Sequence, residues 1–292
     1  MTPTIAIIAP GEMGSAVGAR LKAGGARVLT SLEGRGPASV ARAARAGFET
    51  VADPLQLAEE AQIILSIVPP GAAIGLAERL APALTRARRK PVYVDCNAVA
   101  PATALRIGAI LRPTGCAYVD AGIIGPPPSP KARTVFYAAG EAAPALAALR
   151  EFGLDLRVLA GPVGAASALK MSYAGLTKGL VALGTAMSLG AARGGTTAAL
   201  IEELRESQPA LVATLTRLPT MFPKAYRWVA EMEEIAGFLA GDPAARQIYL
   251  GAARLYERLA EDSAASAAER DAIAAFARAL GAAGARQQGG SS

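Results

Sequence analysis

One lysine, Lys170, stands alone in a long apolar segment and is the first residue whose chemistry needs an explanation. Between Arg157 and Lys178 it is the only charged side chain, and burying an unpaired ammonium is costly. On a helix, the residues three, four and seven positions further on share its face, and these are Tyr173, Ala174 and Thr177. Either Lys170 has a chemical task, or it is an ordinary lysine whose amine reaches solvent from a core helix.

A glycine-rich turn near the start of the chain is the second candidate site. The apolar run over residues 4–9 indicates a strand buried on both faces of a parallel sheet, and a helical pattern follows the turn. In the dinucleotide fingerprint G-x-G-x-x-G, the three glycine positions are occupied here by Ala9, Gly11 and Gly14. Such a turn binds a pyrophosphate at the helix N-terminus, and the alternative is an ordinary strand-to-helix turn. The residues expected to contact a dinucleotide are Gly11, Glu12, Met13 and Gly14.

The residues that follow the second expected strand, Arg27 to Ser31, select between the two nicotinamide dinucleotides. An acidic residue at the strand tip binds the ribose diol of NAD, whereas a small residue with an arginine nearby suits the 2′-phosphate of NADP. Ser31 and Arg35 favour NADP(H), and Glu33 is a competing signal. The sequence therefore predicts NADP(H) in preference to NAD(H); the alternative is that Arg35 is a solvated loop residue.

The composition excludes several other chemistries. The chain has 292 residues, a formal net charge of +6 and no histidine, so histidine-based metal sites and Ser-His-Asp triads are excluded. No metal site is predicted, and acid–base chemistry must use Lys, Tyr, Cys, Asp or Glu. Cys96 and Cys116 are expected to be free, buried thiols. Without a long basic run interleaved with aromatic residues, nucleic-acid binding is not expected.

The elements that position these residues fall into two groups. Strands alternate with helices over residues 1–160, which predicts an α/β domain of the Rossmann type with a doubly wound, mostly parallel sheet. Its expected features include a loop that begins at Asp120 and a helix over residues 142–152. Residues 161–283 are expected to form an all-helical domain for substrate binding and dimerisation, and 284–292 a disordered tail. Because ligands bind outside the carboxyl ends of such strands, Gly11, Pro69, Asn97 and residues 121–125 should line one crevice.

These motifs together resemble the β-hydroxyacid dehydrogenase superfamily, which includes 6-phosphogluconate dehydrogenase and 3-hydroxyisobutyrate dehydrogenase. The resemblance covers about residues 4–280. It is nearest to a bacterial branch in which the NAD(P)-binding Rossmann domain precedes a helical domain of uncharacterised function. The segments that carry it are residues 10–14, 66–69, 93–101, 119–125, 164–170 and 223–236.

The resemblance implies that Lys170 is the catalytic lysine, which protonates a carbonyl oxygen in reduction or deprotonates a hydroxyl in oxidation. A lysine suits this role when its pKa is lowered towards neutrality, and desolvation on an apolar helix face would lower it. The resemblance also implies a nicotinamide held against Val68, Pro69 and Asn97. The substrate would lie against Ala121, Gly122, Ile123, Ile124, Tyr173 and Thr177.

Three departures from the family pattern affect the expected substrate. The family usually has Asn at the position of Ala174, and the phosphogluconate enzymes have His at the position of Tyr173. Where the family substrate loop has Ser-Gly-Gly, this chain has Ile124, Gly125 and Pro126. A bulkier or less polar substrate than a small hydroxycarboxylate is therefore expected.

Two other functions fit the same elements. The chain could be an imine reductase, although the retained Lys170 argues against it, or a non-catalytic NADP-binding protein. A homodimer formed through the helical domain is expected from the resemblance, with Arg227 or Glu231 either at the active-site rim or on a solvated helix face. No signal peptide or membrane span is predicted, so the expected location is the cytoplasm.

Overall fold

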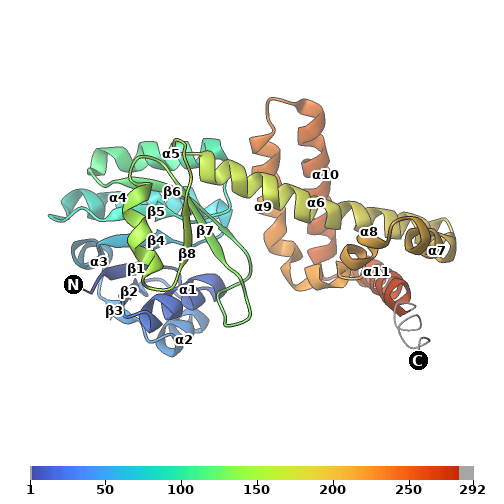
Figure 1. The fold of residues 1–292 in the computed structure, drawn as a ribbon, viewed down its shortest axis with the longest axis horizontal. Coiled ribbons are helices and arrows are strands. Elements are labelled where there is room, and N and C mark those ends of the chain that lie inside the picture. The colour runs from blue at the N-terminus through green and yellow to red at the C-terminus, as the bar shows by residue number, and fades with distance from the viewer. Residues whose placement is uncertain (1, 283–292) are drawn as a thin grey trace. The chain divides into compact units, whose positions relative to one another are not determined.

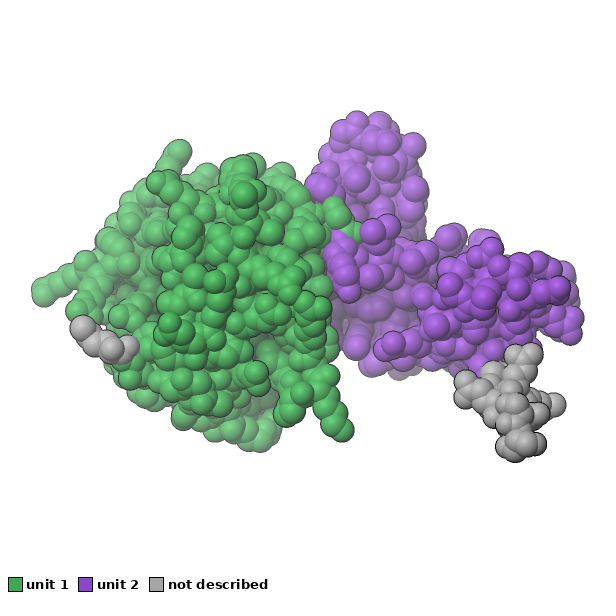
Figure 2. Space-filling view, viewed as in Figure 1, with its two compact units in different colours: residues 1–172 green, residues 173–292 purple. Residues whose placement is uncertain are grey.

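The computed structural model describes residues 2–282, and these residues divide into two compact units, which meet between Ser172 and Tyr173 (Figure 2). The predicted disordered tail at 284–292 lies outside the described residues. The division falls at Ser172, twelve residues after the domain boundary expected at residue 160. The helix that begins at Ala165 starts in the first unit, because the carboxylate of Asp120 accepts hydrogen bonds from its first turn.

The first unit is built on one eight-stranded sheet in the order β3-β2-β1-β4-β5-β6-β7-β8 (Figure 1). Every neighbouring pair is parallel except β6 and β7, which are antiparallel. This topology confirms the prediction of a Rossmann-type, mostly parallel α/β domain. The strands are β1 (Thr4–Ile8), β2 (Arg27–Ser31), β3 (Glu49–Val51), β4 (Ile63–Ser66), β5 (Val92–Asp95), β6 (Tyr118–Ile124), β7 (Val135–Ala139) and β8 (Asp155–Val158).

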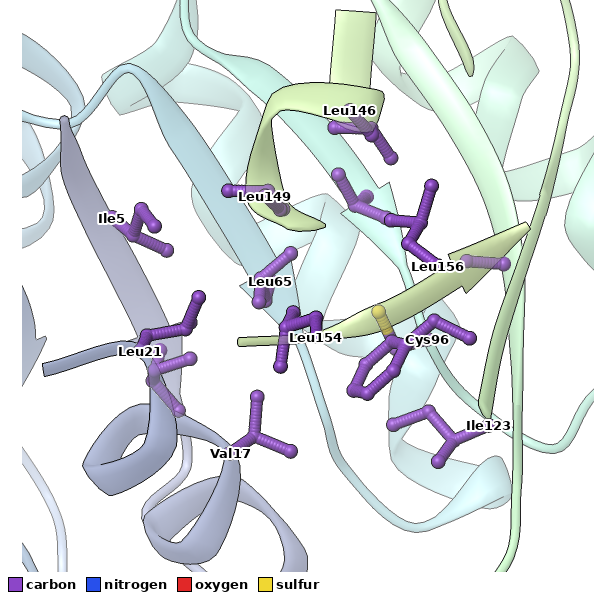
Figure 3. Close-up of a cluster of buried hydrophobic side chains, with 14 of the residues drawn as sticks. Ile5, Val17, Leu21, Leu65, Cys96, Ile123, Leu146, Leu149, Leu154 and Leu156 are labelled. Atoms are coloured by element: carbon purple, nitrogen blue, oxygen red, sulfur yellow. The ribbon is translucent and has the colours of Figure 1, made fainter. Parts of the chain in front are cut away.

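Both faces of the sheet are covered, as expected of parallel strands with apolar residues at successive positions. Along β1, Ile5 and Ile7 pack in one core cluster and Ala6 and Ile8 in another. The first cluster, defined here as core A, includes Val17, Leu21, Leu146, Leu149 and Leu156 (Figure 3). The helices of this unit are α1 (Glu12–Ala23), α2 (Pro37–Arg45), α3 (Pro54–Glu60), α4 (Ala73–Arg86) and α5 (Pro101–Leu111).

The structure corrects two local expectations and adds one helix that was not expected. The segment expected to be a loop from Asp120 continues as strand β6 to Ile124, because it pairs residue by residue with β7. The segment expected to be an α-helix over 142–152 forms a 3₁₀ helix, η3 (Ala143–Arg150). Helix α3 was not expected, although Asp53 caps it by accepting a hydrogen bond from the Gln56 N–H, and Pro54 opens it. The remaining 3₁₀ helices are η1 (Pro70–Ala72), η2 (Arg112–Thr114) and η4 (Leu218–Lys224).

The described residues of the second unit form helices joined by short turns and no strand, as predicted. Its helices α9 and α10 pack together, with the Trp228 ring edge-on to the Tyr256 ring at 5.2 Å between centroids. The Tyr256 hydroxyl donates to the carbonyl of Lys178, which belongs to α6, at 2.6 Å. The helices are α6 (Ala165–Arg193), which begins in the first unit, α7 (Thr197–Ser207), α8 (Pro209–Leu215), α9 (Ala225–Phe238), α10 (Pro243–Ala260) and α11 (Ala264–Ala282). Within residues 2–282, no helix combines the length and the apolar character needed to cross a membrane.

Candidate active site

The turn between β1 and α1 has the backbone that a dinucleotide fingerprint requires. Ala9 adopts a left-handed conformation with φ of 63°, so alanine occupies a conformation for which glycine is the favoured residue. Gly11 is the N-cap of α1, where no side chain caps the helix. A Cβ atom at Gly11 would meet nothing nearer than the Ala9 carbonyl oxygen, 4.0 Å away. The helix N-terminus therefore faces open space at Gly11, which fits close approach by a phosphate group.

Gly14 has a different role in the same turn. A Cβ atom at Gly14 would lie 2.6 Å from the Ala9 carbonyl oxygen and 3.2 Å from the Ile7 side chain. Glycine at this position therefore allows α1 to pack closely on β1, which is the role of the third glycine in the fingerprint. Of the two other residues expected here, Met13 packs against core A and Glu12 is exposed in the first turn of α1.

The tip of β2 combines a buried hydroxyl with two arginines that follow it. Among the described residues, the Ser31 Oγ atom is buried without a hydrogen-bond partner. Arg35 is half-buried in a turn closed by its own N–H and the Leu32 carbonyl. Arg42 was not anticipated from the sequence. Its Nε donates to the Pro10 carbonyl at 2.9 Å and its Nη2 to the Ser39 hydroxyl at 3.2 Å, so α2 carries a guanidinium against the turn between β1 and α1.

Lys170 lies at the carboxyl edge of the sheet. Its Nζ donates to the carbonyl oxygen of Ile123 at 2.8 Å. A Cβ atom on Gly122 would lie 3.0 Å from the Lys170 Cβ and 3.2 Å from the Ala166 carbonyl oxygen. Because Asp120 pairs with Asp95, the last residue of β5, the residues from 121 to 124 extend past the end of that strand. The amine is thereby positioned by two backbone features of β6, the missing side chain at Gly122 and the carbonyl of Ile123.

The start of α6 is fixed by one buried carboxylate. Asp120 is fully buried, and its Oδ2 accepts from the N–H groups of Gly164, Ala166 and Ser167 at 2.8, 3.0 and 3.0 Å. Its Oδ1 accepts from the Ser167 hydroxyl at 2.6 Å. The N–H groups in the first turn of a helix have no partner within the helix, and here a strand residue supplies one. Lys170 therefore stands on a helix turn that is attached to β6.

Val68, Pro69 and Asn97 follow the carboxyl ends of β4 and β5, next to the turn after β1. Asn97 is 3% exposed, so its side chain does not reach solvent. Its Oδ1 accepts from the Val68 N–H at 2.6 Å and its Nδ2 donates to the Ser66 hydroxyl at 3.0 Å and to Asp95 Oδ1. The Asn97 amide thus holds the segment after β4 in place, which the sequence did not indicate.

The residues expected to contact a substrate belong to both units: residues 121–124 to the first, and Tyr173 and Thr177 to the second. The side chains of Ala121 and Ile123 are buried in core A, and Figure 3 shows Ile123 there. Alternate residues of a strand point to opposite faces, so Gly122 and Ile124 lie on the face opposite core A. The contact of residues 121–124 with a substrate stays a prediction. Tyr173, which is 47% exposed, and Thr177 belong to the second unit. The Thr177 hydroxyl donates to the Tyr173 carbonyl at 2.9 Å.

Two buried carboxylates, Asp95 and Asp120, lie side by side on the neighbouring strands β5 and β6. Burial, and then the charge of Asp120, raises the pKa of Asp95 to about 7, although hydrogen bonds from Asn97 act in the opposite direction. Burial raises the pKa of the Tyr118 and Cys96 side chains well above their usual values. Cys96 is therefore a protonated thiol at neutral pH, not a nucleophile.

The second unit buries an ion pair that the sequence did not assign. Lys178 Nζ donates to Glu231 Oε2, and the two side chains are 16% and 15% exposed. Burial lowers the pKa of Lys178, and the charge of Glu231 opposes that shift. Glu231 is thus not on a solvated face of α9. Over residues 2–282, no group of three or more His, Cys, Asp or Glu side chains is arranged to hold a metal ion.

Two family models match the chain. Residues 4–152, half of the sequence, match the NAD binding domain of 6-phosphogluconate dehydrogenase. Residues 191–259 match a domain of unknown function, DUF1932. The first match includes every strand from β1 to β7, together with the turn at Gly11 and the segments that contain Val68 and Asn97.

Individual relatives agree with this assignment. The chain is 28% identical to a 3-hydroxyisobutyrate dehydrogenase of Pseudomonas aeruginosa over 218 residues, 70% of this chain and 69% of that enzyme. It is 30% identical to an uncharacterised 28.5 kDa protein of Methanothermus fervidus over 156 residues, 53% of this chain and 58% of that protein. A solved structure of a conserved protein of unknown function, similar to 3-hydroxyacid dehydrogenases, is 30% identical with a TM-score of 0.65, over 87% of this chain and 98% of that one.

At lower identity, an imine reductase of Myxococcus stipitatus shares the fold with a TM-score of 0.54 and 22% identity, over 94% of this chain and 95% of that one. It was solved with NADP⁺ and, as a variant, with NAD⁺. The strand order, the turn at Gly11 and the family match lead to one assignment. The chain belongs to the β-hydroxyacid dehydrogenase superfamily of NAD(P)-dependent oxidoreductases, with an NAD-binding domain of the 6-phosphogluconate dehydrogenase type.

Proposed function

We propose that this protein is an NADP(H)-dependent oxidoreductase in which Lys170 is the general acid and base. It would interconvert a carbonyl compound and the corresponding alcohol. The observation that carries the proposal is the 2.8 Å hydrogen bond from Lys170 Nζ to the Ile123 carbonyl. This bond holds an amine at the sheet edge where β1 and β4 end, which is the edge that binds ligands in open α/β sheets.

The residues present fit a dinucleotide. The N-terminus of α1 and the open space at Gly11 suit a pyrophosphate, and the segment at Val68 and Pro69 suits the nicotinamide. When bound, a nicotinamide supplies or accepts the hydride. The chain itself would supply the proton: Lys170 Nζ protonates the developing alkoxide oxygen in reduction and receives that proton back in oxidation. One of the three N–H donors of the ammonium is used by Ile123, which fixes the direction of the amine.

The preference for NADP(H) rests on the tip of β2. Ser31 Oγ is a buried hydroxyl without a partner among the described residues, and such a group is costly unless a ligand completes its hydrogen bonding. Arg35 and Arg42 follow β2 in the chain and supply positive charge, and the Arg42 guanidinium contacts the Pro10 carbonyl. A guanidinium suits a 2′-phosphate. Glu33 is exposed and would disfavour that phosphate at short range. Arg35→Ala and Arg42→Ala should each weaken NADPH binding more than NADH binding.

The substrate is proposed to be a carbonyl compound bulkier or less polar than a small hydroxycarboxylate. Ile124 and Pro126 replace the hydroxyl-bearing pattern that the family uses for a carboxylate, and Gly122 is closed off by the Lys170 side chain. Imine reduction on the same fold is the second candidate function, and NADP binding without catalysis is the third candidate function. Lys170 separates them, because only the first requires this amine.

The test is the variant Lys170→Ala, assayed with NADPH against a panel of aldehydes, keto acids and cyclic imines. Carbonyl reduction should fall by at least about 100-fold, the usual contribution of a general acid, while NADPH affinity stays unchanged. Lys131→Ala, which removes an exposed lysine from the connection between β6 and β7, is the matched control. Full carbonyl activity in Lys170→Ala would refute the assigned role, and activity on imines alone would favour the alternative.

The protein is also proposed to form a homodimer through the helical unit. A face of α6 exposes five large apolar side chains at alternating spacings of three and four residues, the pattern that pairs helices. They are 45% to 69% exposed and comprise Tyr173, Leu176, Leu180, Leu183 and Met187. Beside them lies an apolar groove of about 210 Å³ that Leu200, Leu211 and Phe276 help to line. A second copy of this face would cover apolar surface that is otherwise in water.

Light scattering tests this proposal. The wild-type chain should have twice the 29.6 kDa mass of one chain, and Leu183→Glu should reduce it to a monomer. Leu105→Glu is the matched control, because Leu105 is a similarly exposed leucine, 57% against 60%, on α5 of the first unit. A wild-type chain that scatters as a monomer would refute the homodimer.

A further inference from the structure

The side-chain amide of Asn97 forms three hydrogen bonds within the protein. Its oxygen accepts from the Val68 N–H at 2.6 Å, and its nitrogen donates to the Ser66 hydroxyl at 3.0 Å and to Asp95 Oδ1. Both N–H donors of the amide are therefore occupied, and the side chain is 3% exposed. Asn97 thus acts as a bridge from the interior to the backbone of Val68.

The bridge works in one orientation only. If the amide were reversed, its NH₂ group would face the Val68 N–H, and two donors would oppose each other. Asp95 sets the correct orientation, because a carboxylate accepts and does not donate. Its Oδ1 receives both the side-chain nitrogen of Asn97 and, at 3.3 Å, the backbone N–H of Asn97. Ser66 cannot set the orientation alone, since a hydroxyl both donates and accepts.

We propose that Asp95 is a positioning residue that fixes the Val68–Pro69 segment through the Asn97 amide and so controls dinucleotide affinity without touching the dinucleotide. This inference rests on the proposed function, in which that segment holds the nicotinamide. Asp95 is 1% exposed and lies at the end of β5, so the side chain acts only through the residues packed around it.

The surroundings of Asp95 make this control dependent on pH. The titratable side chains that act on it are Tyr93 and Cys96 from its own segment, and Tyr118 and Asp120 from β6. Asp95 Oδ2 and the Tyr118 hydroxyl are both buried, and within residues 2–282 neither lies at hydrogen-bonding distance and angle from a partner. Tyr118 is nevertheless near enough to lower the pKa of Asp95. The pKa of Asp95 is raised to about 7, mainly by burial. Between pH 6 and 8 the group therefore changes from a carboxylic acid, a weaker acceptor for Asn97, to a carboxylate, a stronger one.

Two variants of Asp95 test the bridge by NADPH titration, followed by the fluorescence of the bound nicotinamide. Asp95→Ala removes the acceptor and should weaken NADPH binding about tenfold, the effect of losing one such hydrogen bond. Asn97→Ala should do the same, and the double variant should lose no more than either single one, because both changes break the same bridge. Asp95→Asn keeps an oxygen at this position but not the charge. It should match the wild type at pH 6 and bind more weakly than the wild type at pH 8.

A control variant and a hydrogen-exchange measurement separate this inference from the proposed function. Asp53→Ala removes the cap of α3 elsewhere in the first unit and should leave NADPH affinity unchanged at both pH values. Hydrogen exchange of the Val68 amide, measured without any dinucleotide, should be faster in Asp95→Ala and Asn97→Ala than in the wild type. If the wild type binds neither NADPH nor NADH, the proposed function fails, and amide exchange still decides whether Asp95 fixes the segment.

Unchanged Val68 exchange in Asp95→Ala would overturn the inference. So would an additive loss in the double variant, or an affinity difference between wild type and Asp95→Asn that does not vary with pH.

Discussion

Asp120→Ala should release the first turn of α6 from β6. The carboxylate accepts four hydrogen bonds of 2.6 to 3.0 Å, three from backbone N–H groups and one from the Ser167 hydroxyl, all in the buried interior. At about 1 kcal/mol for each bond, their loss would cost about 4 kcal/mol. A local opening made easier by that amount speeds amide exchange by about a thousandfold. The turn that carries Lys170 would then be held only by its remaining packing.

The assay is hydrogen exchange followed by mass spectrometry on peptides that cover residues 164–170. Asp120→Asn is the informative companion variant, because its single oxygen can still accept from the three backbone N–H groups, so its exchange should lie near that of the wild type. Ser167→Ala removes only one of the four bonds and should have an effect of about 1 kcal/mol or less. Protection of residues 164–170 that is unchanged in Asp120→Ala would refute the reasoning, as would equal exchange in the alanine and asparagine variants.

Three further changes have defined outcomes. Ala9→Gly relieves a left-handed alanine, φ of 63°, and should stabilise the first unit by up to about 1 kcal/mol in urea unfolding; a loss of stability would contradict this. Gly122→Ala places a methyl group 3.0 Å from the Lys170 Cβ, so carbonyl reduction should fall at least about tenfold with NADPH affinity unchanged; wild-type turnover would contradict it. The folded pKa of Asp95, about 7, exceeds its unfolded value of about 3.9, so the folded state holds the extra proton. The stability of the wild type relative to Asp95→Asn should therefore fall, by up to about 4 kcal/mol, as pH rises from 4 to 8. A difference in unfolding free energy that stays constant over this pH range would contradict the raised pKa of Asp95.

The parts of the fold that the sequence predicted are those set by local pattern. The apolar run before Gly11 and the run at 27–31 are buried on both faces, so their composition alone indicated parallel strands. The Asp53–Pro54 pair carried a usable signal for α3, an N-cap followed by a proline at the first helical position. The extension of β6 to Ile124 carried no local signal, because it depends on pairing with β7.

In the candidate site, too, local features were predicted and long-range contacts were not. Gly11 and Gly14 were predicted because a turn and a close packing contact are local features. The roles of Asp120 and Asn97 depend on partners far along the chain, 44 residues in the bond to Gly164 and 29 in the bond to Val68, and no spacing rule reveals them. Arg42 was missed for the same reason, since its contact with Pro10 joins α2 to a turn 32 residues earlier. Ile123 was assigned to a substrate site, although its side chain belongs to core A and only its carbonyl contacts Lys170.

The most direct test of the central claim is a titration of the purified protein with NADPH and, in parallel, with NADH, followed by nicotinamide fluorescence. The turn at Gly11 and the two arginines after β2 predict that both dinucleotides bind and that NADPH binds at least about tenfold more tightly, the difference that one charge-assisted contact to the 2′-phosphate supplies. Tighter binding of NADH would contradict the assignment of Ser31, Arg35 and Arg42. Binding of neither would show that Ala9 has disabled the fingerprint, and it would contradict the proposed oxidoreductase function.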